Sequence, residues 1–164
     1  MQRFKDYVLN RNNRRKIIIW LLGLAILGYL VLEVAQFVVF GLPDNPPVTH
    51  EVQWDSSRTE ELWNRVCQDC HSNETIWPWY SYVFPSAVLV LDDVRDGREK
   101  FNVSTNNLDE AKEIGEQIEE GEMPPSKYIL LHPNANLTDE EKEQLMAGLS
   151  TTFNVSGEGE EDED

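Results

Sequence analysis

Five consecutive residues near the middle of the chain have the types and spacing of a redox cofactor site. Cys67 and Cys70 bracket two residues, and His71 follows at once. Two thiols at this spacing can each form a thioether with a vinyl group of haem, while the adjacent imidazole coordinates the iron. The motif therefore predicts one covalently bound c-type haem, with Cys67 and Cys70 as the thioether residues and His71 as the proximal axial ligand.

The same three residues have rival roles. Cys67 and Cys70 could form a structural disulfide or a thioredoxin-like redox pair, but such a redox pair follows a strand of a βαβ unit, and no such pattern precedes it. A zinc site needs about four ligands, whereas the other two histidines, His50 and His132, are isolated in the sequence. Haem is the interpretation that uses both cysteines and the histidine.

The ligand opposite His71 decides what the iron can do. Met123 is the leading candidate because two prolines follow it and stiffen the segment that would hold its thioether, which lowers the entropy lost on binding. Met146 lies at helical spacing and is predicted to fill the core. His132 is the rival distal ligand and would give a lower reduction potential; an open sixth position is the third alternative.

An aromatic loop follows the cysteine motif. Trp77, Trp79 and Tyr80 lie within four residues of one another. Large apolar side chains of this kind are needed to bury a porphyrin. They are predicted to wall the haem pocket, with ordinary core packing as the alternative.

The start of the chain has the composition of a membrane anchor. The segment 17–40 is apolar except for Glu33 and Gln36, and as a helix it would be about 36 Å long, against a hydrocarbon core of about 30 Å. The basic residues before it should keep residues 1–16 in the cytoplasm and place the rest outside. A cleaved signal peptide is the alternative, but residues 33–35 make a poor cleavage site. Glu33 is predicted to lie at the outer headgroup level and to be solvated.

Charge is divided unevenly along the sequence. The whole chain has a net charge of −16, made up of +4 in the first 40 residues and −20 in the remaining 124. An acidic domain is a poor partner for nucleic acid, because phosphate backbones need a positive surface. The charge instead favours a redox protein partner with a basic docking surface.

Helical periodicity accounts for the rest of the chain, and no convincing strand is found, so the predicted fold is all-α. Helices are expected at about Ser57–Cys70, from Pro85 to near Gly97, at Leu108–Glu120 and at Thr138–Phe153. Two of them begin with a capping box, formed by Ser57 with Glu60 and by Thr138 with Glu141. The first and the last of these helices are expected to pack together beside the haem.

The predicted organisation has five parts. They are a basic N-terminus (1–16), a transmembrane helix (17–40), a proline-rich linker (41–54), a c-type haem domain (55–155) and a disordered acidic tail (156–164). The linker is expected to act as an extended spacer that lifts the haem domain off the membrane, with His50 solvated.

Further matches extend beyond the cysteine motif. They are Cys67-Gln68-Asp69-Cys70-His71-Ser72-Asn73-Glu74-Thr75, Trp77-Pro78-Trp79-Tyr80-Ser81, Gly97-Arg98-Glu99, Asn102, Met123-Pro124-Pro125, Tyr128 and His132-Pro133. On these residues the chain, over roughly 54–153, resembles the bacterial haem-binding domain family of small cytochrome c-like domains, often carried behind one membrane anchor. The resemblance implies a c-type haem held by Cys67, Cys70 and His71, with Met123 as distal ligand. The chain departs from the family at Phe101, where Leu is expected, and at Thr105-Asn106-Asn107, where a Trp is expected.

The sequence thus predicts a single-pass bacterial membrane protein with a periplasmic mono-haem domain that transfers single electrons, a carrier and not an enzyme. One alternative is an accessory haem-bearing subunit of a larger membrane complex, with Glu33 and Gln36 facing neighbouring helices. The other is a haem sensor or peroxidase-like protein with a displaceable sixth ligand.

Overall fold

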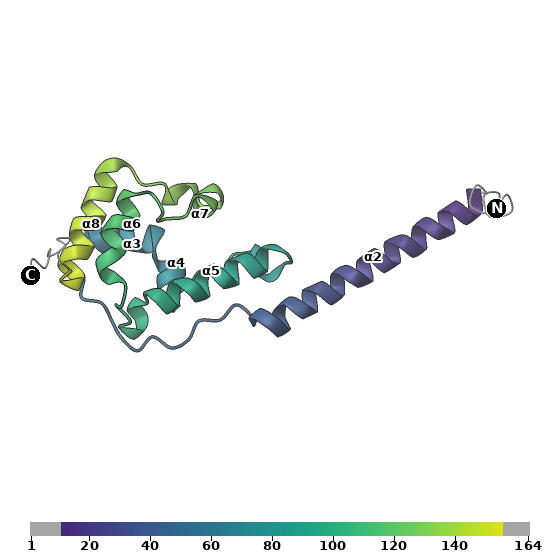
Figure 1. Cartoon of the computed structure of the whole chain (residues 1–164), viewed down its shortest axis with the longest axis horizontal. Coiled ribbons are helices and arrows are strands. Elements are labelled where there is room, and N and C mark those ends of the chain that lie inside the picture. The colour runs from purple at the N-terminus through teal and green to yellow at the C-terminus, as the bar shows by residue number, and fades with distance from the viewer. Residues whose placement is uncertain (1–10, 156–164) are drawn as a thin grey trace, which may run out of the picture.

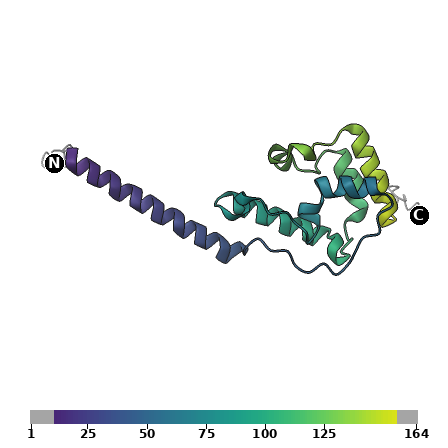
Figure 2. The same ribbon diagram turned by 180° about the vertical axis from the view of Figure 1, so that it is seen from behind.

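A long helix, α2 (Arg11–Phe40), stands apart from a cluster of shorter helices in this computed structural model, which describes residues 11–155 (Figures 1 and 2). The α-helices of the cluster are α3 (Ser57–Val66), α4 (Gln68–His71), α5 (Ser86–Lys100), α6 (Ile114–Glu119), α7 (Ser126–Leu131) and α8 (Asp139–Phe153). Single 3-10 turns lie between them: η1 (Trp79–Tyr82), η2 (Val103–Thr105), η3 (Ala111–Glu113) and η4 (Pro133–Ala135). Over the described range there is no strand, so the all-α prediction is confirmed.

Helix α2 is long and apolar enough to cross a membrane, which fits the predicted single-pass anchor. Its large apolar side chains are exposed, as those of a lipid-facing helix are. Glu33, however, is not simply solvated, as the sequence predicted: its carboxylate accepts a hydrogen bond from the backbone N–H of Phe84, at 3.0 Å. Gln36, one turn further on, is only 4% exposed. The C-terminal end of α2 therefore contacts the helical domain.

The proline-rich segment 41–56 contains no helix, as expected, but it does not act as a free spacer. Asn73 donates a side-chain hydrogen bond to the carbonyl of Pro47 (3.0 Å), and the N–H of Thr49 donates to the carbonyl of Ser104 (2.8 Å). These bonds hold the segment against the domain. The prediction that it is a spacer that lifts the domain off the membrane is therefore wrong. His50 is exposed, as expected.

The core is centred on α3 and α8, so the expected packing of these two helices is confirmed. Leu62 of α3 and Leu145 and Leu149 of α8 are among the most deeply buried side chains. The two helices approach closely at Gly148, where an added Cβ would lie 2.0 Å from the Oγ1 atom of Thr59. Only a residue without a side chain fits at this contact.

Both of these helices begin with a side-chain cap. The capping box of Thr138 and Glu141 forms as predicted. At the start of α3 the capping residue is Ser56 and not Ser57: its hydroxyl accepts the N–H of Thr59, at 3.2 Å. The predicted capping box of Ser57 with Glu60 is therefore wrong: Ser57 is already helical, and Thr59, not Glu60, stands three residues after the extended N-cap Ser56.

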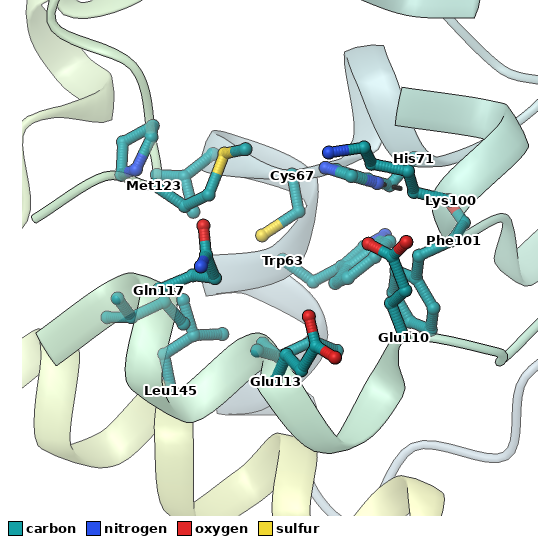
Figure 3. A pocket seen from close by; sticks show the side chains of 14 residues that line it. Trp63, Cys67, His71, Lys100, Phe101, Glu110, Glu113, Gln117, Met123 and Leu145 are labelled. Atoms are coloured by element: carbon teal, nitrogen blue, oxygen red, sulfur yellow. Dashed lines mark hydrogen bonds between the residues drawn. The ribbon is translucent and has the colours of Figure 1, made fainter. Parts of the chain in front are cut away.

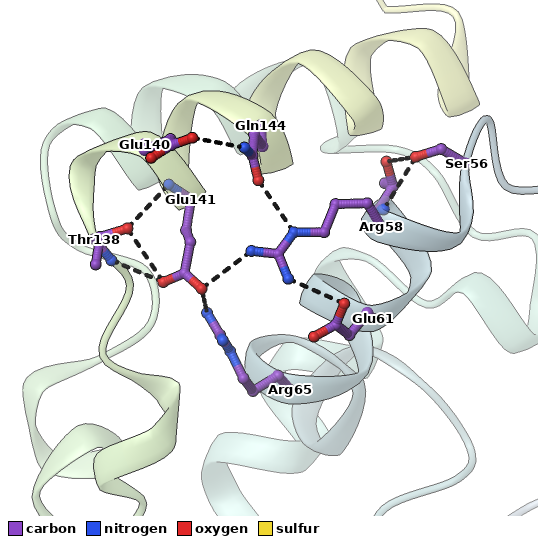
Figure 4. A network of polar contacts seen from close by, with 9 residues as sticks. Ser56, Arg58, Glu61, Arg65, Thr138, Glu140, Glu141 and Gln144 are labelled. Carbon is purple, nitrogen blue, oxygen red and sulfur yellow. Dashed lines mark hydrogen bonds and ion pairs between the residues drawn. The ribbon is translucent and has the colours of Figure 1, made fainter.

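Glu141 also joins the two helices (Figure 4). Its Oε1 atom lies 2.7 Å from Nη2 of Arg65 and 3.2 Å from Nη2 of Arg58, both on α3. Its other oxygen accepts the N–H of Thr138. One carboxylate therefore caps α8 and fastens it to α3.

The middle of the chain is less regular than predicted. The expected helix Leu108–Glu120 is broken into the turn η3 and the six-residue helix α6, which ends just before Gly121 as expected. Helix α7, after Met123, was not predicted, because six residues are too few to show a helical period. The predicted disordered tail (156–164) and the first ten residues lie outside the described residues.

Replacing Gly148 with Ala should destabilise the domain. The new methyl group would overlap Thr59 and force α3 and α8 apart, so the free energy of unfolding should fall by about 1–3 kcal/mol. Gly115→Ala is the control, because nothing lies within 4 Å of a Cβ there, and it should be neutral or slightly stabilising. Denaturant unfolding measures both; equal effects would contradict the close contact.

Glu141→Gln should destabilise the fold in a pH-dependent way. The hydrogen bond from the N–H of Thr138 and the ion pair with Arg65 lower the pKa of Glu141 from 4.5 to about 2. Because the folded-state pKa is the lower one, the carboxylate stabilises the fold above pH 4.5, and this contribution is lost as the pH falls toward 2. The Tm of the variant should therefore lie below that of the wild type at neutral pH, and the two should converge on acidification. A difference that does not change with pH would contradict the assignment; Glu140→Gln is the matched control.

Candidate functional site

His71, the last residue of α4, is held by two backbone carbonyls. Its Nδ1 atom lies 3.1 Å from the carbonyl oxygen of Gly97 and 3.0 Å from that of Phe101. Carbonyls only accept hydrogen bonds, so Nδ1 carries the proton and Nε2 keeps its lone pair. Burial lowers the pKa of His71 and keeps the ring neutral. The result is an oriented imidazole whose Nε2 atom is available to a metal.

Gly97 makes this arrangement possible. A Cβ at Gly97 would lie only 2.6 Å from the carbonyl oxygen of Cys70. Because glycine has none, the backbone of α5 lies directly against α4. The last carbonyls of α5 thereby reach His71.

A cavity with an empty volume of about 780 Å³ lies beside His71 (Figure 3). It is lined by Cys67, His71 and Met123, three of the predicted site residues. Figure 3 shows Met123 and His71 on opposite sides of the Cys67 thiol. The cavity thus brings together an attachment cysteine and both predicted axial ligands.

Both cysteines are free thiols and are partly buried. Burial raises the pKa of Cys67 and of Cys70 to about 12. A thioredoxin-like pair needs the opposite shift, toward a reactive thiolate. A thioether carries no charge and is not penalised by burial. Among residues 11–155 no group of three or more His, Cys, Asp and Glu side chains is placed to hold a metal ion, so the zinc alternative lacks its ligands.

Cys70 lies on a second cavity, with an empty volume of about 690 Å³. His132 and Tyr80 line it too, and the Nε2 atom of His132 is 3.3 Å from the hydroxyl of Tyr80. The ring of His132 also stacks on Tyr128, with 4.1 Å between centroids. The structure therefore places Met123, and not His132, in the cavity that holds His71.

The aromatic loop is not arranged as the sequence suggested. Trp77 and Trp79 line neither of these two cavities. The indole N–H of Trp77 donates to Asn45 (3.1 Å), the guanidinium of Arg98 lies over its ring, and Trp79 is 76% exposed. Of the three predicted aromatic residues, Tyr80 alone lines one of these two cavities. Trp77 is held by polar partners, which explains its place outside the pocket.

The aromatic wall beside His71 comes from Trp63 and Phe101. Their rings meet edge to face, with 5.7 Å between centroids, and both line the first cavity. Trp63 lies one helical turn before Cys67, so its place on the same face could be read from the sequence. Phe101, a departure from the family pattern, is 3% exposed and fills the core at this point. Lys100 and Gln117, also in the lining, left no signal in the sequence.

Other motif residues form a scaffold behind the site. Arg98 donates to the carbonyl of Ser72 and to the hydroxyl of Thr75, both at 2.8 Å. The side chain of Asn102 donates to that of Asn73, at 2.9 Å. These bonds fix the path of the chain as it leaves His71. The matched motif positions therefore serve the geometry of the site as well as its lining.

Of three comparisons with known proteins, one gave a match. A family model described as a haem-binding domain matches residues 30–151, well over half of the chain. No curated protein and no solved structure matches.

Gly97→Ala should release His71 from its carbonyl partners. The added methyl group would push α5 away from α4, and the proton on Nδ1 would lose both acceptors. In the haem-free chain, nitrogen NMR should show a single Nδ1-protonated tautomer of His71 in the wild type at neutral pH and a mixture of tautomers in the variant. Gly115→Ala, which is also helical, should keep the wild-type signal. A mixture in the wild type itself would contradict the proposed orientation.

Proposed function

Since the chain belongs to the haem-binding domain family, we propose that it is a membrane-anchored cytochrome that carries one covalently bound c-type haem and transfers single electrons. Membership of the family supports haem as the cofactor. The observation that carries the finer proposal is the cavity in which Cys67, His71 and Met123 meet.

The residues present fit such a group. Cys67 and Cys70 would form the two thioethers. Because Cys67 lines the first cavity and Cys70 lines the second, the haem would have to reach both cavities. His71 would be the proximal ligand through Nε2, since its Nδ1 atom is already bonded. Met123 would be the distal ligand, because it shares the first cavity with His71.

When bound, haem supplies an iron that alternates between the ferrous and ferric states. His71 and Met123 together would fill both axial positions and leave none for a substrate, which favours a carrier over an enzyme. The thioether of Met123 as an axial ligand favours a higher reduction potential than a second histidine would. Trp63 and Phe101 would give the haem an apolar wall on the side of His71.

The anchor and the charge support a place outside the cytoplasm. Helix α2 would span the membrane with its basic start in the cytoplasm, and the haem domain would lie in the bacterial periplasm. The acidic domain would attract a basic redox partner into a short-lived contact whose rate falls with salt.

Contacts at the outer end of α2 favour a tethered carrier over a complex subunit. The subunit alternative relied on Glu33 and Gln36 to face neighbouring helices. Glu33 instead accepts the N–H of Phe84, and the amide of Gln36 donates to Glu33. The Glu33 carboxylate and the amide N–H of Gln36 thus have partners within the chain.

Met123→Ala tests the distal ligand. The variant should lose the absorption band of the sulfur–iron bond, and its reduction potential should fall by on the order of 100 mV, within the range of about 0.8 V that axial ligands set. His132→Ala is the matched control and should keep both properties. If the band and potential survive in Met123→Ala and change in His132→Ala, the ligand is His132.

If the wild type binds carbon monoxide rapidly when reduced, the sixth position is open and the sensor or peroxidase-like alternative holds.

A further inference from the structure

The loop before α5 is hydrogen-bonded to α2 at a defined position along that helix. The N–H of Phe84 donates to Glu33 (3.0 Å), and the hydroxyl of Tyr29 donates to the carbonyl of Phe84 (3.3 Å). Glu33 lies 17 residues after Lys16, the last basic residue before the apolar segment, which is about 25 Å along a helix. With a hydrocarbon core of about 30 Å, this is the level at which the acyl chains of the outer leaflet meet the headgroups.

Exposed apolar side chains gather around the same loop. We call them the apolar rim: Ile76, Trp79, Tyr82, Leu89, Leu130 and Leu131, which are 47–78% exposed. Ile76, Leu89 and Leu131 also line the second cavity, so the rim borders the cavity of Cys70. Figures 1 and 2 both show the start of α5 and the helix α7 extending toward the side on which α2 runs. The rim thus faces the side of the domain that is fastened to the anchor.

The six side chains of the rim are uncharged in a chain that is otherwise rich in charge, and the exposed Lys127 beside them is neutralised by its ion pair with Asp93. From Ile76 to Leu91 there is no Asp, Glu, Lys, Arg or His, although 27% of the chain is charged and its net charge is −16. A surface of this kind gains nothing from a charged partner. Trp and Tyr are the residues that favour the boundary between lipid and water.

We propose that the apolar rim rests on the outer leaflet of the bilayer that α2 spans, so that the second cavity opens at the membrane surface. The inference rests on the proposed membrane anchoring. It favours the bilayer over a protein or a second copy of the chain because the bonds of Phe84 hold the rim at the level of the lipid whatever else binds. The acidic surface away from the rim remains available to a basic partner.

Photo-crosslinking to lipid tests the contact. The full-length haem-loaded protein is placed, one copy per disc, in phosphatidylcholine nanodiscs that contain a phosphatidylcholine with a diazirine in its acyl chain. After irradiation, peptide mass spectrometry locates the lipid adducts. Adducts are expected on α2 and on residues 76–91 and 126–131, several-fold more per residue than on α8, and with no dependence on salt.

A variant of the rim sharpens the test. Trp79 and Leu130 are 76% and 78% exposed, so the double substitution Trp79→Ser with Leu130→Ser leaves the core untouched. It should reduce the adducts on the rim several-fold and leave those on α2 unchanged. Val48→Ser is the control, since Val48 is also exposed but precedes Thr49, which is bonded to η2 beyond the other end of α5.

Three results would overturn the inference. Adducts on α2 alone would show that the anchor spans the membrane and the rim does not touch it. Adducts on neither would remove the membrane assignment itself and the inference with it. Rim adducts that are unchanged in the double variant would show that these side chains do not make the contact.

Discussion

The orientation of one imidazole depends on a contact between two backbones. The single N–H at Nδ1 of His71 is shared by two carbonyl acceptors, that of Gly97 in the last turn of α5 and that of Phe101, which caps α5. They reach it only because Gly97 lets α5 lie against the carbonyl of Cys70. The polar scaffold of Arg98 and Asn102, the packing of Phe101 and the path of the segment 41–56 all maintain this approach. The structure thus fixes the orientation of an imidazole whose Nε2 atom is free to bind a metal.

Three surfaces of the molecule suit different surroundings. Helix α2 is apolar and suits lipid, the apolar rim consists of exposed aliphatic and aromatic side chains, and the rest of the domain is acidic and suits water. On the proposed function, this division gives the electron carrier a fixed orientation above the membrane. An anchored carrier that is also oriented presents the same face to each partner, which reduces the orientational search on encounter.

Local patterns could be predicted from the sequence, and long-range contacts could not. Cys67, Cys70 and His71 form a motif within five residues, Thr138 and Glu141 form a cap within four, and α2 is marked by its composition. The acceptors of His71 lie 26 and 30 residues away, and backbone carbonyls leave no signal in a sequence. The prediction that Trp77 lines the pocket was wrong for a related reason, because its hydrogen-bond partner Asn45 lies 32 residues away in the sequence. Glu33 gained a partner 51 residues away that its own neighbours do not indicate.

A single haem held between His71 and Met123 is the central feature of the proposed function. The most direct test is an anaerobic redox titration of the detergent-solubilised full-length protein, followed by optical spectroscopy. One reversible one-electron transition between low-spin spectra is expected, with the sulfur–iron band in the oxidised form. The haem should also stay attached when the protein is unfolded in acid and extracted with organic solvent. A high-spin spectrum, more than one transition or a haem that can be extracted would contradict the proposed function.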